Sequence, residues 1–269
     1  MKYYSPIKKC VVFTQSNATA VFWDSFWAES DNAKNDISKI RSTWITAIVT
    51  QYLSPEDGPI IEGGCGCAEH VAALANNKYS VIGIDWAKET VRSRAREYPQ
   101  FDVRVGDVRE LPFPDGHFAG YLSLGVIEHF EEGAREIFLE MMRVVKDDGY
   151  LFLAFPYMSP IRKFKSWIRS YPLWPSPKMP KDFYQFALDT KAVVHDLREF
   201  GFRLVESIPM DMDNGTREEL PAVHAMVTRL LAYRGKNILI RGVRRIMLMI
   251  LPFFAGHSVL LILKKTRLK

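Results

Sequence analysis

The chain has 269 residues, of which 48% are hydrophobic and 25% are charged, enough to bury a substantial core as one α/β domain. Three cysteines exclude a fold held by several disulfides and favour a reducing, cytoplasmic setting. The formal net charge of +5 permits nucleic acid or an anionic membrane as a partner, but it also fits a merely solvated surface. The opening MKYYSPIKKC has no apolar run behind its charges and predicts no signal peptide.

Residues 1–57 predict an N-terminal helical cap. They contain the aromatic cluster VFWDSFWAE and then a stretch whose apolar residues recur at helical spacing. That second stretch should place one apolar face on a core. The residues of this face are Ile37, Ile40, Trp44, Ile48 and Tyr52.

From residue 58 onward, short apolar runs alternate with amphipathic stretches. Strands are expected at PIIE, SVIGID, FDVRVGDV, FAGYLSLG and GYLFLAFP, with helices beginning near Glu69, Lys88 and Glu131. One more helix and strand follow in TKAVVHDLREFG and FRLVESIPM, and HSVLLILKK supplies the last strand. This alternation is typical of βαβ units, so residues 58–269 predict a doubly wound, mostly parallel α/β sheet.

Two segments interrupt the rhythm and are expected to be insertions, at about 157–186 and 211–255. The first is rich in proline, aromatic and basic residues, and the second becomes basic and strongly apolar. Each could be a lid over a pocket, or together they could contact an anionic membrane or a lipid-linked molecule. Residues 246–263 carry no charged side chain, but Pro252 and Gly256 interrupt them, which favours a helix followed by a strand over a membrane span.

The stretch IIEGGCGCAEHV, residues 60–71, places a glycine-rich turn between a strand and a helix. A dinucleotide fingerprint would need glycine where Glu69 stands, and a phosphate loop would need a Gly-Lys-Ser/Thr sequence that is absent. Cys65, Cys67 and His70 offer three zinc ligands, but no fourth ligand follows at a suitable spacing, so we expect no metal site. The cysteines are expected to be small residues that fill the turn.

What remains of this stretch is an acidic residue at the strand end, Glu62, followed by a small residue at every second position: Gly64, Gly66 and Ala68. Acidic residues also end the next two strands, at Asp85 and at Asp107 with its neighbour Val108. Carboxylates at these points could grip ribose hydroxyls and an adenine amino group. All of these residues should converge on the crevice beyond the carboxyl ends of the strands.

Residues 59–156 therefore resemble a class I S-adenosylmethionine-dependent methyltransferase of the small-molecule branch. The resemblance implies a Rossmann-like sheet of seven strands with an antiparallel last strand, and S-adenosylmethionine as the cofactor. It places Glu62, Gly64 and Gly66 beside the methionine moiety. It places the other cofactor residues as follows: Asp85 on the ribose, Trp86 along the adenine, Asp107 and Val108 at the adenine edge, and Ser123 or Leu124 facing the sulfonium.

The family also implies a methyl transfer by in-line displacement, which requires a base when the acceptor is a hydroxyl or an ammonium. His129 is the candidate base, with Glu128 beside it, although both could instead hold the loop in place. Tyr157, Tyr184 and His257 are further candidates to reach the acceptor or to pack around it. In some related enzymes an E-x-x-E-H motif here binds a metal, but Gly125 replaces the first acid.

The expected acceptor is a small or lipid-linked molecule with an oxygen or nitrogen nucleophile. Two alternatives stay open: an RNA methyltransferase, and a cofactor-binding partner subunit without activity. The chain shows neither an appended RNA-binding module nor a base-flipping motif, so nucleic acid is not the expected partner. The sequence indicates no oligomeric state. It predicts a cytoplasmic protein that could also contact a membrane peripherally.

Overall fold

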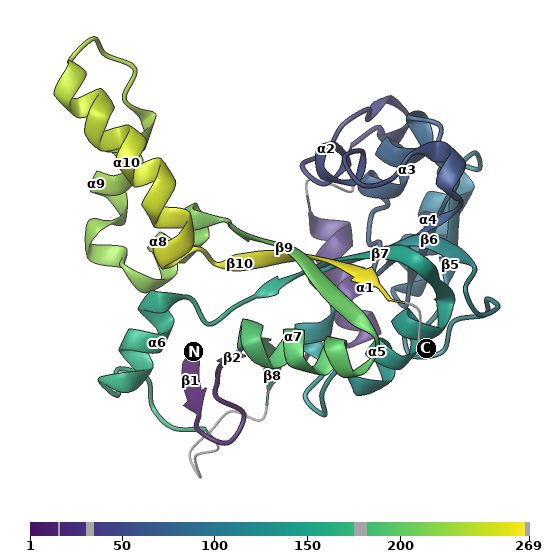
Figure 1. Ribbon diagram of the computed structural model, residues 1–269, viewed down its shortest axis with the longest axis horizontal. Coiled ribbons are helices and arrows are strands. Elements are labelled where there is room, and N and C mark those ends of the chain that lie inside the picture. Colours follow the sequence, from purple (N-terminus) through teal and green to yellow (C-terminus); the bar gives the residue numbers. More distant parts are fainter. Residues whose placement is uncertain (16, 31–34, 175–181, 267–269) are drawn as a thin grey trace.

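The computed structural model describes all residues except 16, 31–34, 175–181 and 267–269. Its main sheet has seven strands in the order β5-β4-β3-β6-β7-β10-β9, all parallel except β10, which runs antiparallel to both of its neighbours (Figure 1). The predicted doubly wound sheet with an antiparallel last strand is thereby confirmed. These strands are β3 (Ile60–Gly63), β4 (Val81–Asp85), β5 (Asp102–Val105), β6 (Phe118–Leu124), β7 (Val145–Pro156), β9 (Phe202–Met210) and β10 (Ser258–Lys265).

Helices cover both faces of this sheet. Neighbouring strand residues point to opposite faces, so Ile60 belongs to one apolar core and Ile61 to the other. The helices that pack on the Ile60 side are α2 (Thr46–Val49), α3 (Glu69–Asn76) and α4 (Lys88–Glu97). On the Ile61 side lie α5 (Arg135–Val144) and α7 (Thr190–Glu199). The helix expected near Glu131 therefore begins four residues later, at Arg135.

The strand order reverses between β3 and β6, because the chain builds the sheet outward in both directions from β3. The connections leaving these two strands consequently diverge, which opens a crevice beyond their carboxyl ends. The glycine turn follows β3 directly, and the short 3-10 helix η4 (Ile127–His129) follows β6. The fold thus brings the predicted cofactor residues and the predicted base to one place.

Residues 1–57 differ from the helical cap that the sequence predicts, because they begin with a hairpin. β1 (Lys2–Ser5) pairs with β2 (Cys10–Thr14), and β2 pairs with β8 (Phe183–Ala187) from the first insertion. The chain start and the segment after β7 therefore share a small three-stranded sheet. Helix α1 (Ala20–Glu29) and the 3-10 turns η2 (Ile37–Lys39) and η3 (Pro55–Asp57) complete this part of the chain.

The continuous helix expected from Ile37 to Tyr52 is wrong: this stretch, all of it described, forms only η2 and the single turn α2. Side-chain amides donate hydrogen bonds to the backbone carbonyl groups that would accept from backbone N–H groups in a helix. Asn76 Nδ2 donates to the carbonyls of Ser38 and Ile40, at 3.2 and 2.7 Å. The apolar residues pack on the core from separate turns, and Trp44 stays 46% exposed.

Both predicted insertions lie outside the seven-stranded sheet. The first contains α6 (Pro160–Trp167) and β8, and part of it, 175–181, lies outside the described residues. The second contains α8 (Met212–Glu219), α9 (Pro221–Ala232) and α10 (Ile238–Ala255). Figure 1 shows α9 and α10 projecting from one end of the molecule, beyond β9 and β10. We call residues 212–256 the arm.

A buried cluster of charges holds the base of the arm to the body. The Arg162 side chain is fully buried and donates to Glu219 Oε1 at 3.1 Å and to the carbonyls of Tyr157 and His257 at 2.9 Å. Glu219 also pairs with Lys2 and Lys165 and accepts from the Tyr171 hydroxyl. A buried ion pair of this kind tolerates loss of one partner poorly, so it fixes α8 against α6 and β1.

Candidate active site

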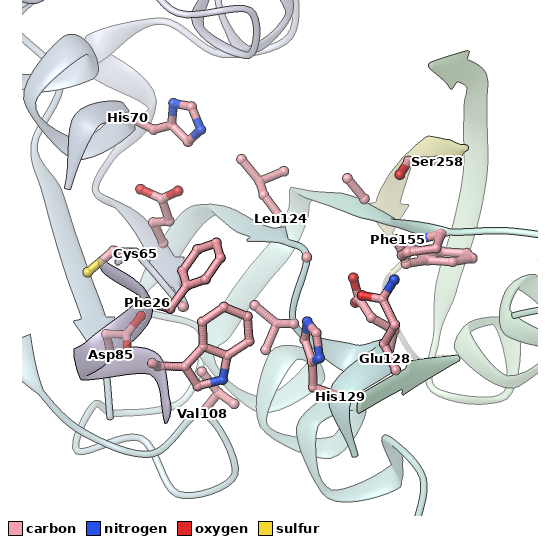
Figure 2. A pocket seen from close by; sticks show the side chains of 18 of the residues that line it. Phe26, Cys65, His70, Asp85, Val108, Leu124, Glu128, His129, Phe155 and Ser258 are labelled. Atoms are coloured by element: carbon pink, nitrogen blue, oxygen red, sulfur yellow. The ribbon is translucent and has the colours of Figure 1, made fainter. Parts of the chain in front are cut away.

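A cavity of about 740 Å³ opens in the crevice beyond the carboxyl ends of β3, β4, β6 and β7. Figure 2 shows Cys65, His70 and Asp85 on one side of it, and Glu128, His129, Phe155 and Ser258 toward the other. The sequence predicts the first side as the cofactor end and the second as the acceptor end. The two ends meet near Leu124, the last residue of β6.

The glycine turn owes its shape to left-handed backbone that glycine adopts easily. Gly64 has φ +79°, and a Cβ on it would lie 2.4 Å from a Val126 methyl, so any other residue here would have to displace Val126. Gly66 has φ +49°, and the Trp27 indole occupies the place of its absent side chain. Ala68 is also left-handed at φ +63°, a conformation that costs an L residue about 1–2 kcal/mol.

Glu62 lies on β3 with only 2% of its surface exposed, at the floor of the cavity. Its Oε2 has no hydrogen-bond partner among the described residues. Burial, together with the negative charge of Asp85, raises the pKa of this carboxyl well above its ordinary value. An orphaned buried carboxylate oxygen is a natural partner for a cation, and the ammonium of S-adenosylmethionine fits this need.

Asp85 ends β4 and is held by backbone donors. Its Oδ2 accepts from the Gly66 N–H and its Oδ1 from the Ala87 N–H, both at 2.8 Å. Burial raises the pKa of this carboxyl, and the two N–H groups oppose the rise. A carboxylate oxygen can accept more than one hydrogen bond, so both oxygens keep capacity for two ribose hydroxyls.

The expected adenine side is built by residues after β4 and β5. Asp107 is held by Arg109, with 2.7 Å between Arg109 Nη2 and Asp107 Oδ2, and this hydrogen bond lowers the pKa of the carboxyl. Val108 is nearly buried, and the Trp86 ring lies 5.8 Å from that of Phe130. All three expected adenine neighbours line the cavity.

Seven of the nine predicted cofactor residues line the cavity. They are Glu62, Gly64, Asp85, Trp86, Asp107, Val108 and Leu124. Gly66 does not, because Trp27 covers it, and Ser123 does not, because its side chain is buried within the sheet at 1% exposure. Of the pair Ser123 and Leu124, the structure therefore leaves Leu124 to face the cofactor, and the contacts themselves stay predictions.

Helix α1 contributes a wall that the sequence analysis did not assign. Trp23, Phe26 and Trp27 line the cavity, and Figure 2 shows Phe26 reaching into it near Asp85. The helix is fastened to α4 by Asp24, whose Oδ1 accepts from the Thr90 N–H at 2.9 Å and the Thr90 hydroxyl at 3.0 Å. The signal was present in VFWDSFWAE, where aromatic residues three and four apart share one helix face.

The predicted base, His129, is half-buried against the rings of Trp23 and Tyr184 at the acceptor end. Its Nδ1 lies 2.8 Å from the Tyr184 carbonyl, which can only accept, so Nδ1 carries the hydrogen and Nε2 keeps its lone pair. Burial lowers the pKa of His129 to about 4. The imidazole is therefore neutral at physiological pH, in the tautomer that a proton acceptor needs.

Glu128 is also buried and faces the cavity. Burial raises the pKa of its carboxyl to about 8, and its Oε2 has no hydrogen-bond partner in the described part of the chain. Its pKa lies nearer to physiological pH than that of His129, which makes it the better matched acid or base. Tyr184 and His257 line the same end, whereas the Tyr157 hydroxyl donates to the Phe253 carbonyl instead.

The two cysteines of the glycine turn are buried free thiols. Burial raises the pKa of both, and the Cys65 sulfur packs where a side chain on Gly83 would stand. The described residues contain no group of three or more His, Cys, Asp and Glu side chains that could hold a metal ion. These contacts indicate that the two thiols pack the turn.

The strand order, the glycine turn after β3 and the acids at the ends of β3, β4 and β5 together define a class I S-adenosylmethionine-dependent methyltransferase domain. Residues 61–153 match the model of the family described as methyltransferase domain, and this segment belongs to that family. The family takes S-adenosylmethionine as its cofactor.

Curated relatives match the same region. A probable S-adenosylmethionine-dependent methyltransferase of Mycolicibacterium smegmatis is 32% identical over 97 residues, 36% of this chain and 37% of the relative. A demethylmenaquinone methyltransferase of Lysinibacillus sphaericus is 29% identical over 113 residues, 40% of this chain and 48% of the relative. Two further relatives, from Bos taurus and Mus musculus, are each named probable tRNA methyltransferase 9B. The chain thus spans less than half the length of the curated relatives it matches.

A solved structure is similar over nearly the whole chain. A chain from the complex between the Haloferax volcanii Trm112 methyltransferase activator and a methyltransferase superposes with a TM-score of 0.57. The match covers 91% of this chain and 98% of that one, at 16% identity. At this identity the likeness establishes the shared fold and nothing finer.

Proposed function

We propose that the protein transfers the methyl group of S-adenosylmethionine to an oxygen or nitrogen nucleophile of a small or lipid-linked molecule. The observation that carries the proposal is one continuous cavity with buried acids at one end and a neutral imidazole at the other. The family matched by residues 61–153 supports the reaction type. The apolar surroundings at the acceptor end, with Phe155, Met210 and Tyr184, support an acceptor with an apolar part.

When bound, the cofactor supplies a methyl group on a positively charged sulfur, which leaves as a neutral thioether. Glu62 would neutralise the ammonium, and Asp85 would orient the ribose so that the methyl points past Leu124 toward the acceptor. His129 Nε2 or the ionised Glu128 would take the proton that the acceptor releases. Helix α1 would exclude water from the cofactor end, since Trp23, Phe26 and Trp27 cover it.

Calorimetry with S-adenosylmethionine tests the proposal at its first step. Asp85→Ala should weaken binding by roughly 10- to 100-fold, because it removes charge-assisted hydrogen bonds worth about 1.5–3 kcal/mol. Asp102→Ala removes a carboxylate that is paired with Arg104 on the surface of β5, outside the cavity lining, and should leave the affinity unchanged. Equal affinities in wild type and Asp85→Ala, or no binding by either, would contradict the proposal.

Two other functions are compatible with specific observations. The relatives named probable tRNA methyltransferases and the net charge of +5 favour an RNA acceptor. The residues at the cofactor end would serve a cofactor-binding subunit without turnover equally well. Mass spectrometry of molecules that co-purify with the protein, followed by methyl transfer to them, separates the three. A methylated small molecule supports the proposal, methylated tRNA replaces it, and cofactor binding without any product favours the inactive subunit.

A further inference from the structure

The outer face of α10 is an uninterrupted apolar stripe that faces solvent. Its residues recur every three or four positions and therefore lie on one side of the helix. They are Leu239, Val243, Ile246, Ile250 and Phe253, with exposed fractions of 76%, 49%, 56%, 56% and 66%. Exposed apolar patches of this extent are rare on a protein without a partner for them.

Beyond α8, the arm that carries this stripe has only positive charges. No aspartate or glutamate occurs from Pro221 to the last residue, whereas α9, α10 and their connection hold six basic residues. Those six are Arg229, Arg234, Lys236, Arg241, Arg244 and Arg245. Arg241 and Arg245 are exposed on α10, roughly 160° and 120° around the helix from the middle of the stripe. Arg244 turns inward and donates to the Leu231 carbonyl at 2.7 Å.

This combination points to an anionic bilayer rather than a second copy of the chain. Two copies of the α9–α10 pair laid face to face would bring together twelve positive charges without an aspartate or glutamate in either pair. An anionic lipid surface supplies those partners and also buries the stripe. No helix in the described ranges is long and apolar enough to cross a membrane, so α10 would lie along the surface.

A second apolar element, helix α6, lies against the base of the arm. Helix α6 packs against α10 and exposes Trp167 to 76% and Phe164 to 51%. Tryptophan favours the level of the lipid headgroups. The arm also begins and ends at the cavity: Asp211 and His257 line its acceptor end, and the His257 N–H donates to the Asp211 carbonyl at 3.1 Å.

We propose that the arm docks the protein on anionic membranes through the apolar stripe of α10 and the exposed basic residues of α9, α10 and their connection. As a consequence, which rests on the proposed methyl transfer, the acceptor is an amphiphile that enters the cavity from the bilayer at the root of the arm. Docking itself requires neither the cofactor nor turnover, so it can be measured apart from both.

Vesicle flotation at low salt tests the docking. Wild type should float with phosphatidylcholine vesicles that contain phosphatidylglycerol and should stay at the bottom with phosphatidylcholine alone. Ile246→Ser with Phe253→Ser should reduce partitioning at least tenfold through lost apolar burial. Arg241→Gln with Arg245→Gln should reduce partitioning about fivefold for each arginine. High salt should also reduce the partitioning of wild type, because it screens the attraction between the arginines and the anionic lipids.

The matched control is Ile7→Ser, which removes an isoleucine that is 85% exposed in the turn between β1 and β2. It should float like wild type. The proposal would be overturned if wild type did not float with anionic vesicles, or if the control lost as much vesicle binding as the stripe variant. A dimer in sedimentation that the stripe variant dissociates would assign the stripe to a second copy instead. Calorimetry of the same variants with S-adenosylmethionine should give unchanged affinity, which keeps this test independent of the proposed function.

Discussion

Glu128→Gln should change how the stability of the protein depends on pH. The folded carboxyl has a pKa of about 8 because of burial, against an ordinary value near 4.5. Between these values the folded state holds a proton that the unfolded state has released. The free energy of unfolding therefore falls as pH rises, by about 1.4 kcal/mol per pH unit for this one group. The penalty is absent below pH 4.5 and complete above pH 8.

Glutamine mimics the protonated carboxyl and cannot ionise. From pH 5 to pH 7, wild type should lose about 2–3 kcal/mol of unfolding free energy relative to Glu128→Gln. Urea denaturation of both proteins at each pH gives this difference directly, and it cancels the contributions of other buried groups such as Glu62. Glu131→Gln changes an exposed glutamate nearby and should follow wild type. Parallel pH profiles for wild type and Glu128→Gln would refute the buried, protonated carboxyl.

Three other substitutions test the turn, the base of the arm and the aromatic wall. Gly64→Ala should lower the unfolding free energy by roughly 2–5 kcal/mol in urea, since it adds a steric clash to an unfavourable φ. Gly133→Ala has φ +110° but open space around it, so it should show the backbone penalty alone. Arg162→Leu should cost about 3–5 kcal/mol in thermal unfolding, because it leaves Glu219 buried with fewer partners; a loss below 1 kcal/mol would contradict the anchoring role. Trp27→Ala should weaken S-adenosylmethionine binding in calorimetry about threefold to tenfold through lost packing, with unfolding changed little; unchanged affinity would remove α1 from the cofactor site.

The predictable part of the fold came from local signals. Strand ends at Glu62, Asp85 and Asp107 were visible because apolar runs stop there, and parallel strands bring such ends to one edge. Ser123 shows the limit of this reasoning. Neighbouring residues on a strand face opposite sides, so the choice between Ser123 and Leu124 required the register of β6 against β3 and β7.

The parts that the sequence did not predict depend on contacts between distant segments. β2 pairs with β8 about 170 residues later, and no pattern within either strand names the other. The aromatic face of α1 is visible in the sequence, but its position on the cavity depends on Asp24 meeting Thr90, a contact that no local pattern indicates. The helix predicted from Ile37 failed for the same reason, because Asn76 and Asn77, more than 30 residues away, bind its carbonyl groups.

The two ends of the arm are neighbours in the sheet: Met210 of β9 stands opposite Ser258 of β10. The 45 residues between Asp211 and His257 are therefore a long helical loop that connects two antiparallel neighbouring strands, β9 and β10. Such a connection can lengthen, shorten or be exchanged while the strands keep their register. If the arm docks and guides the acceptor as proposed, a chain with this sheet can exchange both properties without any change in the residues at the cofactor end.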